Sequence, residues 1–176
     1  MKTCKVCKTK FNPSYTSMQK VCSQVCALAL SRQERSKAER KRLKERKEKL
    51  KTLTNIIAEL QPIFNEFIRL RDKDEPCISC QRFHQGQIHA GHYLTRGARP
   101  NLRFDENNVH AQCSACNNHL SGNLINYRIN LINKIGLEEV ERLENDHEPR
   151  HYTKKDIAEM KAHYRKLIRE LKKDAA

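Results

Sequence analysis

The eight cysteines of this 176-residue chain fall into four close pairs, a spacing typical of zinc ligands. A tetrahedral zinc site needs four sulfur or nitrogen ligands at one point, and a tight turn between two cysteines supplies two of them. The absence of an apolar signal segment in residues 1–10 favours metal binding over a disulfide framework. We therefore expect two structural Zn²⁺ ions, one held by Cys4, Cys7, Cys22 and Cys26, and one by Cys77, Cys80, Cys113 and Cys116.

Other side chains that could bind a metal or transfer a proton lie between the third and fourth cysteine pairs and directly after the fourth. His89 and His92 occur in the strand-like segment QIHAGHYL, and Asn108 and Asn117 flank the last cysteine pair. A histidine can take a proton from water, and an amide oxygen can bind a divalent cation. For Asn117, helix capping is the alternative to metal binding.

The composition favours a small protein with a polyanionic partner. Hydrophobic residues make up 38% of the chain, charged residues 32%, and Trp is absent, so the cores must be modest. The formal net charge of +14 points to nucleic acid, here duplex or branched DNA. A membrane is not an expected partner, because no apolar run approaches the roughly 20 residues that a spanning helix needs. Few aromatic side chains are available for base stacking, which disfavours an RNA-binding zinc protein.

The sequence predicts a small, mostly helical α+β fold in four parts. These are a Cys4 zinc module (1–30), a long basic and then amphipathic helical segment (31–75), a zinc-supported core (76–125) and C-terminal helices (126–176).

Residues 32–51 contain eleven Lys and Arg against four Glu, with few apolar side chains. Such a segment forms either a solvated spacer helix with i,i+4 ion pairs or a helix that follows a DNA backbone. Residues 53–71 instead have an apolar helical face, which we expect to pack on the zinc-supported core. The candidate DNA contacts in the basic segment are Arg40, Lys41, Arg42 and Lys44.

The joint spacing of His92, Asn108, the last cysteine pair and Asn117 resembles the HNH, or ββα-metal, nuclease family in its zinc-supported form. That resemblance implies two strands and a helix, with His92 as general base and Asn108 as the residue that orients it. It further implies that Asn117, at the helix start, binds a catalytic Mg²⁺ or Mn²⁺.

The chain departs from the HNH pattern at Gly91. The family usually has Asp or His there, directly before the general base, as the first metal ligand. The resemblance leaves open whether the ion is held by His89, by His110 or Asp105, or only weakly. Three arginines between the base and the orienting asparagine are expected to face the scissile phosphate, with solvent exposure as the alternative: Arg96, Arg99 and Arg103.

Nearly the whole chain is similar to the phage lambda NinG (Rap) family. The segments that carry this likeness are CKVCKTKF, CSQVCALAL, CISCQRFHQGQIHAGHYLTRG and CSACNNHLSGN. The family implies an endonuclease for branched recombination intermediates such as Holliday junctions and D-loops, located in the cytoplasm or nucleoid of a bacterial host. Symmetric junction cutting favours a homodimer, and phage recombination proteins are further expected partners. A non-catalytic zinc adaptor that binds DNA and recruits recombination proteins is the alternative, supported by Gly91.

Overall fold

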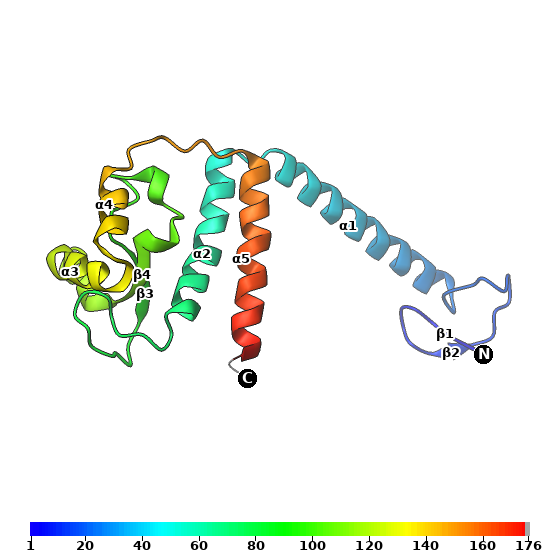
Figure 1. Ribbon diagram of the computed structural model, residues 1–176. Helices are drawn as coiled ribbons and strands as arrows, with labels where there is room; N and C mark the ends of the chain where they lie inside the picture. The colour runs from blue at the N-terminus through cyan, green and yellow to red at the C-terminus, as the bar shows by residue number, and fades with distance from the viewer. Residues whose placement is uncertain (175–176) are drawn as a thin grey trace. The chain divides into compact units, whose positions relative to one another are not determined.

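The computed structural model describes residues 1–174, which divide into two compact units, residues 1–51 and residues 52–174 (Figure 1). Within the described residues, no helix is both long and apolar enough to span a membrane. The helical segment expected over 31–75 consists of two helices, one in each unit, and residues 50–52 separate them.

The first unit contains a small hairpin, with Cys4 and Cys7 in its turn, and a long helix. Strand β1 (Lys2–Thr3) pairs antiparallel with β2 (Lys10–Phe11), and the turn between them carries Lys8 with a φ of 65°. Helix α1 (Gln24–Lys49) begins just after Cys22 and includes Cys26, and the Ser23 side chain caps its start by accepting a hydrogen bond from the N–H of Cys26. No residue of α1 is buried, so this helix has no apolar partner within its unit.

Helix α2 (Leu53–Arg71) opens the second unit, where Thr52 caps it by accepting from the N–H of Asn55. A two-stranded antiparallel sheet, β3 and β4, lies between helices α2 and α5 on one face and α3 and α4 on the other (Figure 1). The register places Gly91 opposite His110. The remaining bounds are β3 Ile88–His92, β4 Val109–Cys113, α3 Leu124–Ile135, α4 Leu137–Asn145 and α5 Lys154–Asp174.

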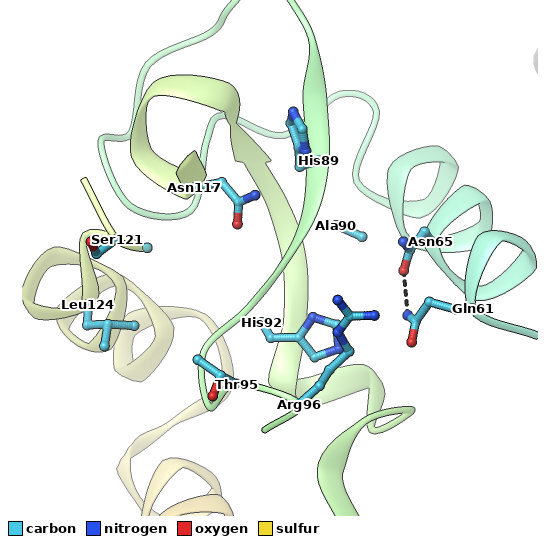
Figure 2. Close-up of a pocket in the computed structure, with 11 residues that line it drawn as sticks. Gln61, Asn65, His89, Ala90, His92, Thr95, Arg96, Asn117, Ser121 and Leu124 are labelled. Atoms are coloured by element: carbon cyan, nitrogen blue, oxygen red, sulfur yellow. Dashed lines mark hydrogen bonds between the residues drawn. The ribbon is translucent and has the colours of Figure 1, made fainter. Parts of the chain in front are cut away.

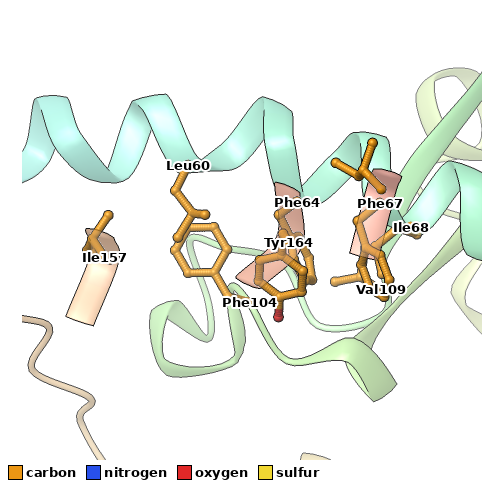
Figure 3. Packing of buried hydrophobic residues seen from close by; sticks show 9 residues of the cluster. Leu60, Phe64, Phe67, Ile68, Phe104, Val109, Ile157 and Tyr164 are labelled. Carbon is orange, nitrogen blue, oxygen red and sulfur yellow. The ribbon is translucent and has the colours of Figure 1, made fainter. Parts of the chain in front are cut away.

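An aromatic cluster joins α2 and α5 to the sheet (Figure 3). Phe64 meets Phe104 edge-on at 5.5 Å between ring centroids and Tyr164 at 5.1 Å. The expected packing of residues 53–71 on the zinc-supported core is confirmed. The buried members are Leu60, Phe64, Phe67, Ile68, Phe104, Val109, Ile157, Tyr164 and Ile168.

A second apolar cluster covers the opposite face of the sheet. Tyr127 of α3 is fully buried there, and its hydroxyl donates to the carbonyl oxygen of Gly91 at 3.0 Å. The hairpin is thus fixed from both sides. The cluster consists of Ile78, Tyr93, Leu102, Tyr127, Leu131, Val140 and Leu143.

The helix expected directly after β4 is only a short π-helical turn, Ala115–His119. The following residues Ser121, Gly122 and Asn123 have φ values of 48°, 87° and 45°, a left-handed run that no right-handed helix can include. Helix α3 begins after this break. Short 3₁₀ turns at Pro100–Leu102 and Glu106–Asn108 complete the loop between the strands.

Candidate zinc clusters and active site

The first cysteine quartet, in residues 1–51, brings four sulfur atoms within 4.8 Å of one another. The Sγ atoms of Cys7 and Cys22 are 3.4 Å apart, and the hydroxyl of Thr9 donates to Cys7 Sγ. Four converging sulfur ligands fit a structural Zn²⁺. The quartet predicted from the cysteine spacing is confirmed.

The second quartet is equally compact and is more deeply buried. The backbone N–H of Cys113 donates to Cys77 Sγ at 3.3 Å, and that of Cys116 donates to Cys113 Sγ at 3.5 Å. Such N–H donors stabilise thiolates and orient them toward a metal. This quartet could also hold Zn²⁺, and it ties the start of β3 to the end of β4 through the turns that carry its ligands.

A cavity of about 320 Å³ lies beside β3 in the second unit (Figure 2). It gathers four of the site residues predicted from the sequence: His89, His92, Arg96 and Asn117. In Figure 2, Asn117 lies on one side of β3, while Gln61 and Asn65 of α2 lie on the other. The histidines and the asparagine that the spacing singled out therefore share one solvent-accessible space.

His92 is fixed by a hydrogen bond to the main chain. Its Nε2 lies 3.0 Å from the carbonyl oxygen of Arg103, which only accepts, so Nε2 carries the proton. In the neutral imidazole, Nδ1 is then the free acceptor. This is the tautomer that a general base needs.

The surroundings of His92 keep its imidazole neutral. Burial lowers the pKa of His92 from 6.5 to about 4; the bond to Arg103 opposes this, and the charges of Arg96 and Arg103 add to it. At neutral pH the ring is therefore ready to accept a proton.

Asn108 is fully buried beneath the cavity and does not line it. Its Oδ1 accepts from the N–H of Leu94 at 2.8 Å, and its Nδ2 donates to the carbonyl oxygens of Leu94 and Leu102 at 3.0 and 3.1 Å. One side chain thus holds Leu94 and Leu102 together, and Leu102 directly precedes Arg103, whose carbonyl oxygen contacts His92.

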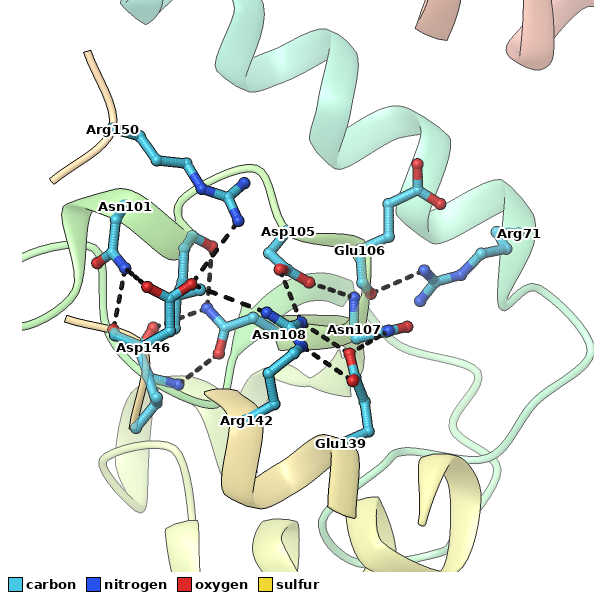
Figure 4. A network of polar contacts seen from close by, with 12 residues as sticks. Arg71, Asn101, Asp105, Glu106, Asn107, Asn108, Glu139, Arg142, Asp146 and Arg150 are labelled. Atoms are coloured by element: carbon cyan, nitrogen blue, oxygen red, sulfur yellow. Dashed lines mark hydrogen bonds and ion pairs between the residues drawn. The ribbon is translucent and has the colours of Figure 1, made fainter. Parts of the chain in front are cut away.

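A polar network holds the turn that leads into Asn108 (Figure 4). Arg142 of α4 donates to Asp105 at 3.0 Å and to Glu139 at 2.7 Å, and Asn107 donates to Glu139 at 2.7 Å. The carboxylate of Asp105 is therefore engaged by an arginine. It does not line the cavity.

His110, the other alternative ligand, also lies outside the cavity. It is buried on the opposite strand, where its Nδ1 is 3.3 Å from the hydroxyl of Tyr127. Of the candidates for the first metal ligand, only His89 lines the space that His92 and Asn117 share.

The three predicted phosphate-facing arginines have different positions. Arg96 lines the cavity, whereas Arg99 donates to His147 at 3.1 Å, beside the segment between α4 and α5. The guanidinium of Arg103 donates to Gln61 at 2.6 Å and lies over the ring of Phe104. The structure therefore leaves Arg96 as the arginine at the site, while Arg103 contributes through its carbonyl oxygen.

Among the cavity residues that the sequence did not single out, two are side-chain amides of α2. Gln61 and Asn65 of α2 line the cavity, and Gln61 Nε2 donates to Asn65 Oδ1 at 2.8 Å. The available signal was a pair of amides four residues apart within an otherwise apolar helical face. The candidate DNA contacts Arg40, Lys41, Arg42 and Lys44 all lie exposed on α1 of the first unit.

Comparison with known proteins places the chain in a family. The family model described as "Bacteriophage Lambda NinG protein" matches residues 1–174. The chain belongs to the NinG family. It is similar to "Protein ninG" of Escherichia phage 933W, with 41% identity over 186 residues covering 96% of this chain and 92% of the relative. It is also similar to the proteins of that name in Salmonella phage P22 and Escherichia phage lambda, each 40% identical over 94% of this chain and 90% of the relative.

The NinG match spans both compact units and includes both cysteine quartets. No solved structure matches the chain.

Proposed function

We propose that the chain is a metal-dependent DNA endonuclease of the HNH type that cuts branched recombination intermediates. The observation that carries the proposal is the fixed, neutral imidazole of His92 in a cavity shared with His89 and Asn117. A buried base with its acceptor nitrogen free is of no use to a purely structural zinc module. It is what the hydrolysis of a phosphodiester requires.

In the proposed reaction, Nδ1 of His92 takes one proton from a water molecule while the water oxygen forms a bond to phosphorus. The bond from phosphorus to the leaving 3′ or 5′ oxygen then breaks, and that oxygen takes a proton from solvent water, while the imidazolium of His92 returns its proton to the resulting hydroxide. The Arg103 carbonyl stabilises the imidazolium that forms, because it already accepts a hydrogen bond from Nε2. Asn108 keeps that carbonyl in place by closing the loop on both sides.

A divalent cation fits the donor set at the cavity. Asn117 donates through Nδ2 to Asn118 at 3.0 Å, which leaves its Oδ1 for another partner, and His89 has a buried Nε2 with no hydrogen-bond partner. Asn117 and His89 would hold the ion. When bound, Mg²⁺ or Mn²⁺ supplies a positive charge that stabilises the developing charge on the phosphate and on the leaving oxygen.

DNA as the substrate is supported by the formal charge of +14 and by the position of Arg96 at the cavity. The exposed basic face of α1 offers further phosphate contacts. Holliday junctions and D-loops as preferred substrates rest on the resemblance of the sequence to the NinG (Rap) family. A homodimer and contacts with phage recombination proteins belong to the same proposal.

The test is cleavage of a labelled four-way junction and of a matched linear duplex, with Mg²⁺ or Mn²⁺. We expect cuts in the junction that require the metal and that disappear in His92→Ala, while DNA affinity stays nearly unchanged because phosphate contacts dominate it. His151→Ala is the control, since His151 is exposed in the segment before α5 and outside the cavity. Junction binding without cleavage under either ion would contradict the proposal.

That negative outcome would favour a non-catalytic zinc adaptor that binds DNA and recruits recombination proteins. The observation behind this alternative is Gly91, which supplies no side chain at the strand position before His92.

A further inference from the structure

Gly91 is a glycine because the neighbouring strand occupies the space of its side chain. A Cβ atom built on Gly91 would lie 2.1 Å from Oε1 of Gln112 and 2.8 Å from Cβ of Gln112. These separations are far below contact distance, so any larger residue would displace Gln112. The place where a side chain would start at position 91 is instead filled by the amide oxygen of Gln112.

The amide of Gln112 is held in one orientation. Its Nε2 donates to the carbonyl oxygen of Gly122 at 2.6 Å and to Oγ of Ser79 at 2.7 Å. A carbonyl oxygen only accepts, so the amide cannot be turned around without placing two oxygens against each other. The side chain is completely buried, yet its Oε1 has no hydrogen-bond partner.

A second unpartnered atom lies on the opposing residue. His89 is paired with Gln112 across the β3–β4 hairpin, and its buried Nε2 also has no partner. Among the residues that the structure describes, the only other buried side-chain nitrogen or oxygen without a partner is Nε of Arg99. Buried polar atoms in proteins are nearly always paired, so two exceptions on residues that pair across the hairpin call for a partner, and one of the two residues, His89, lines the cavity.

Alternation along β3 gives the two positions a shared geometry. Residues 89 and 91 point to the same face of the strand, since successive side chains alternate. A ligand missing at Gly91 can therefore be replaced on the same face by His89 from β3 and by Gln112 from β4. An imidazole nitrogen and an amide oxygen are both acceptable ligands for Mn²⁺, and the amide oxygen also suits Mg²⁺.

We propose that Oε1 of Gln112 and Nε2 of His89 are the strand ligands of the divalent cation, and that Asn117 completes the protein's contribution from the turn after β4. Gln112 thus supplies the ligand that Gly91 lacks, and Gly91 is small so that Gln112 can do so. This inference rests on the proposed nuclease function for the purpose of the ion, while the ion site itself is tested without DNA.

The experiment is a titration of the zinc-loaded, full-length protein with Mn²⁺ alone, followed by the electron paramagnetic resonance signal of free Mn²⁺. We expect the wild-type protein to bind one Mn²⁺ and His89→Ala to bind it at least about tenfold more weakly. Gln112→Met, of similar size but without a hard ligand, should lose affinity to the same extent. Gln112→Glu should bind Mn²⁺ clearly more tightly than Gln112→Met, because it keeps an oxygen ligand and adds negative charge.

The paired Gln112 variants separate a ligand from a packing residue, since both lose the hydrogen bond to Gly122. Equal loss of Mn²⁺ affinity in Gln112→Met and Gln112→Glu would overturn the proposal, as would unchanged affinity in Gln112→Met. So would a wild-type protein that binds no Mn²⁺. Zinc content and the thermal unfolding midpoint of each variant identify any that fail to fold, and His89→Ala then decides, because His89 makes no hydrogen bond through Nε2. If the protein binds Mn²⁺ at this site but does not cut DNA, the proposed function is wrong and the proposed ion site is still supported.

Discussion

The two cysteine quartets have the same ligands but lie in opposite surroundings. In residues 1–51 the only buried side chains are Cys4 and Val21. In residues 52–174 the quartet is joined to a hairpin that has an apolar cluster on each face. The same four-cysteine ligand set therefore stands in two different settings. A bound Zn²⁺ would have to supply most of the stability of the first unit, whereas in the second unit it would fasten one end of a hairpin that already has a core.

The first unit has no other large source of stability. Its two strands have two residues each, and α1 buries nothing. Apolar burial contributes roughly 25 cal/mol per Å², so a unit with almost no buried area cannot offset the entropy of ordering its chain. Structural zinc contributes about 10–16 kcal/mol in comparably small modules.

The largest expected effect follows from removing one ligand in each unit. In Cys4→Ser, the backbone amides of residues 2–22 should lose all protection from hydrogen exchange, because zinc is their only strong constraint. In Cys113→Ser, zinc should also be lost, but exchange should rise only around the cysteine turns and the hairpin. Mass spectrometry of exchanged peptides, with zinc content measured in parallel, checks both.

The two cysteine variants control for each other, since each leaves the other quartet intact. Protected amides around β1 and β2 in a zinc-free Cys4→Ser chain would show that the first unit folds without zinc. Complete unfolding of α2 and α5 in Cys113→Ser would show that the second unit depends on zinc as much as the first.

A smaller effect comes from matched leucines in the two long helices. Leu60 of α2 is fully buried, while Leu28 of α1 is 63% exposed. Leu60→Ala should lower the free energy of unfolding of the second unit by about 2–5 kcal/mol, through lost burial and a cavity. Leu28→Ala should change stability by no more than about 0.5 kcal/mol.

Urea denaturation followed by circular dichroism measures both leucine variants. A large cost for Leu28→Ala would show that α1 has an apolar partner. It would then be wrong to treat the first unit as held by zinc alone.

The sequence predicted those features that depend on residue type and spacing within one short segment. Cysteine pairs predicted both quartets, and the apolar face of residues 53–71 predicted the packing of α2. The change from a basic segment to an apolar helical face after residue 51 marked where α1 gives way to α2. It did not show that the helix itself is interrupted there, with Thr52 as the cap of a new helix.

The position of Arg103 could not be read from the sequence for a different reason. Its guanidinium binds Gln61, which is 42 residues away in the chain, and its useful atom is a main-chain oxygen. Every residue has a main-chain carbonyl, so residue type does not predict which one contacts His92. Gln112 was not predicted as a candidate ligand for a related reason, because its pairing with His89 depends on the strand register.

The smallest expected effect is a pH dependence that only the second unit can show through histidine, since residues 1–51 contain none. The pKa of His92 is lowered from 6.5 to about 4 in the folded chain, chiefly by burial. Its contribution to stability is therefore complete above pH 6.5 and is lost as pH falls toward 4, because the unfolded chain binds the proton more readily. Between pH 7.5 and 5 this should lower the free energy of unfolding by about 1–2 kcal/mol.

His92→Gln isolates that contribution, because a glutamine amide can still donate to the Arg103 carbonyl but does not titrate. Urea denaturation of the zinc-loaded wild type and of His92→Gln at pH 7.5 and 5 gives the two pH dependences, and their difference belongs to His92. Other groups, including the buried His110 and the cysteine thiolates, are common to both proteins and cancel. Identical pH dependences would mean that His92 is solvated and protonates normally. It would then be charged in mildly acidic solution and unable to act there as the proposed base.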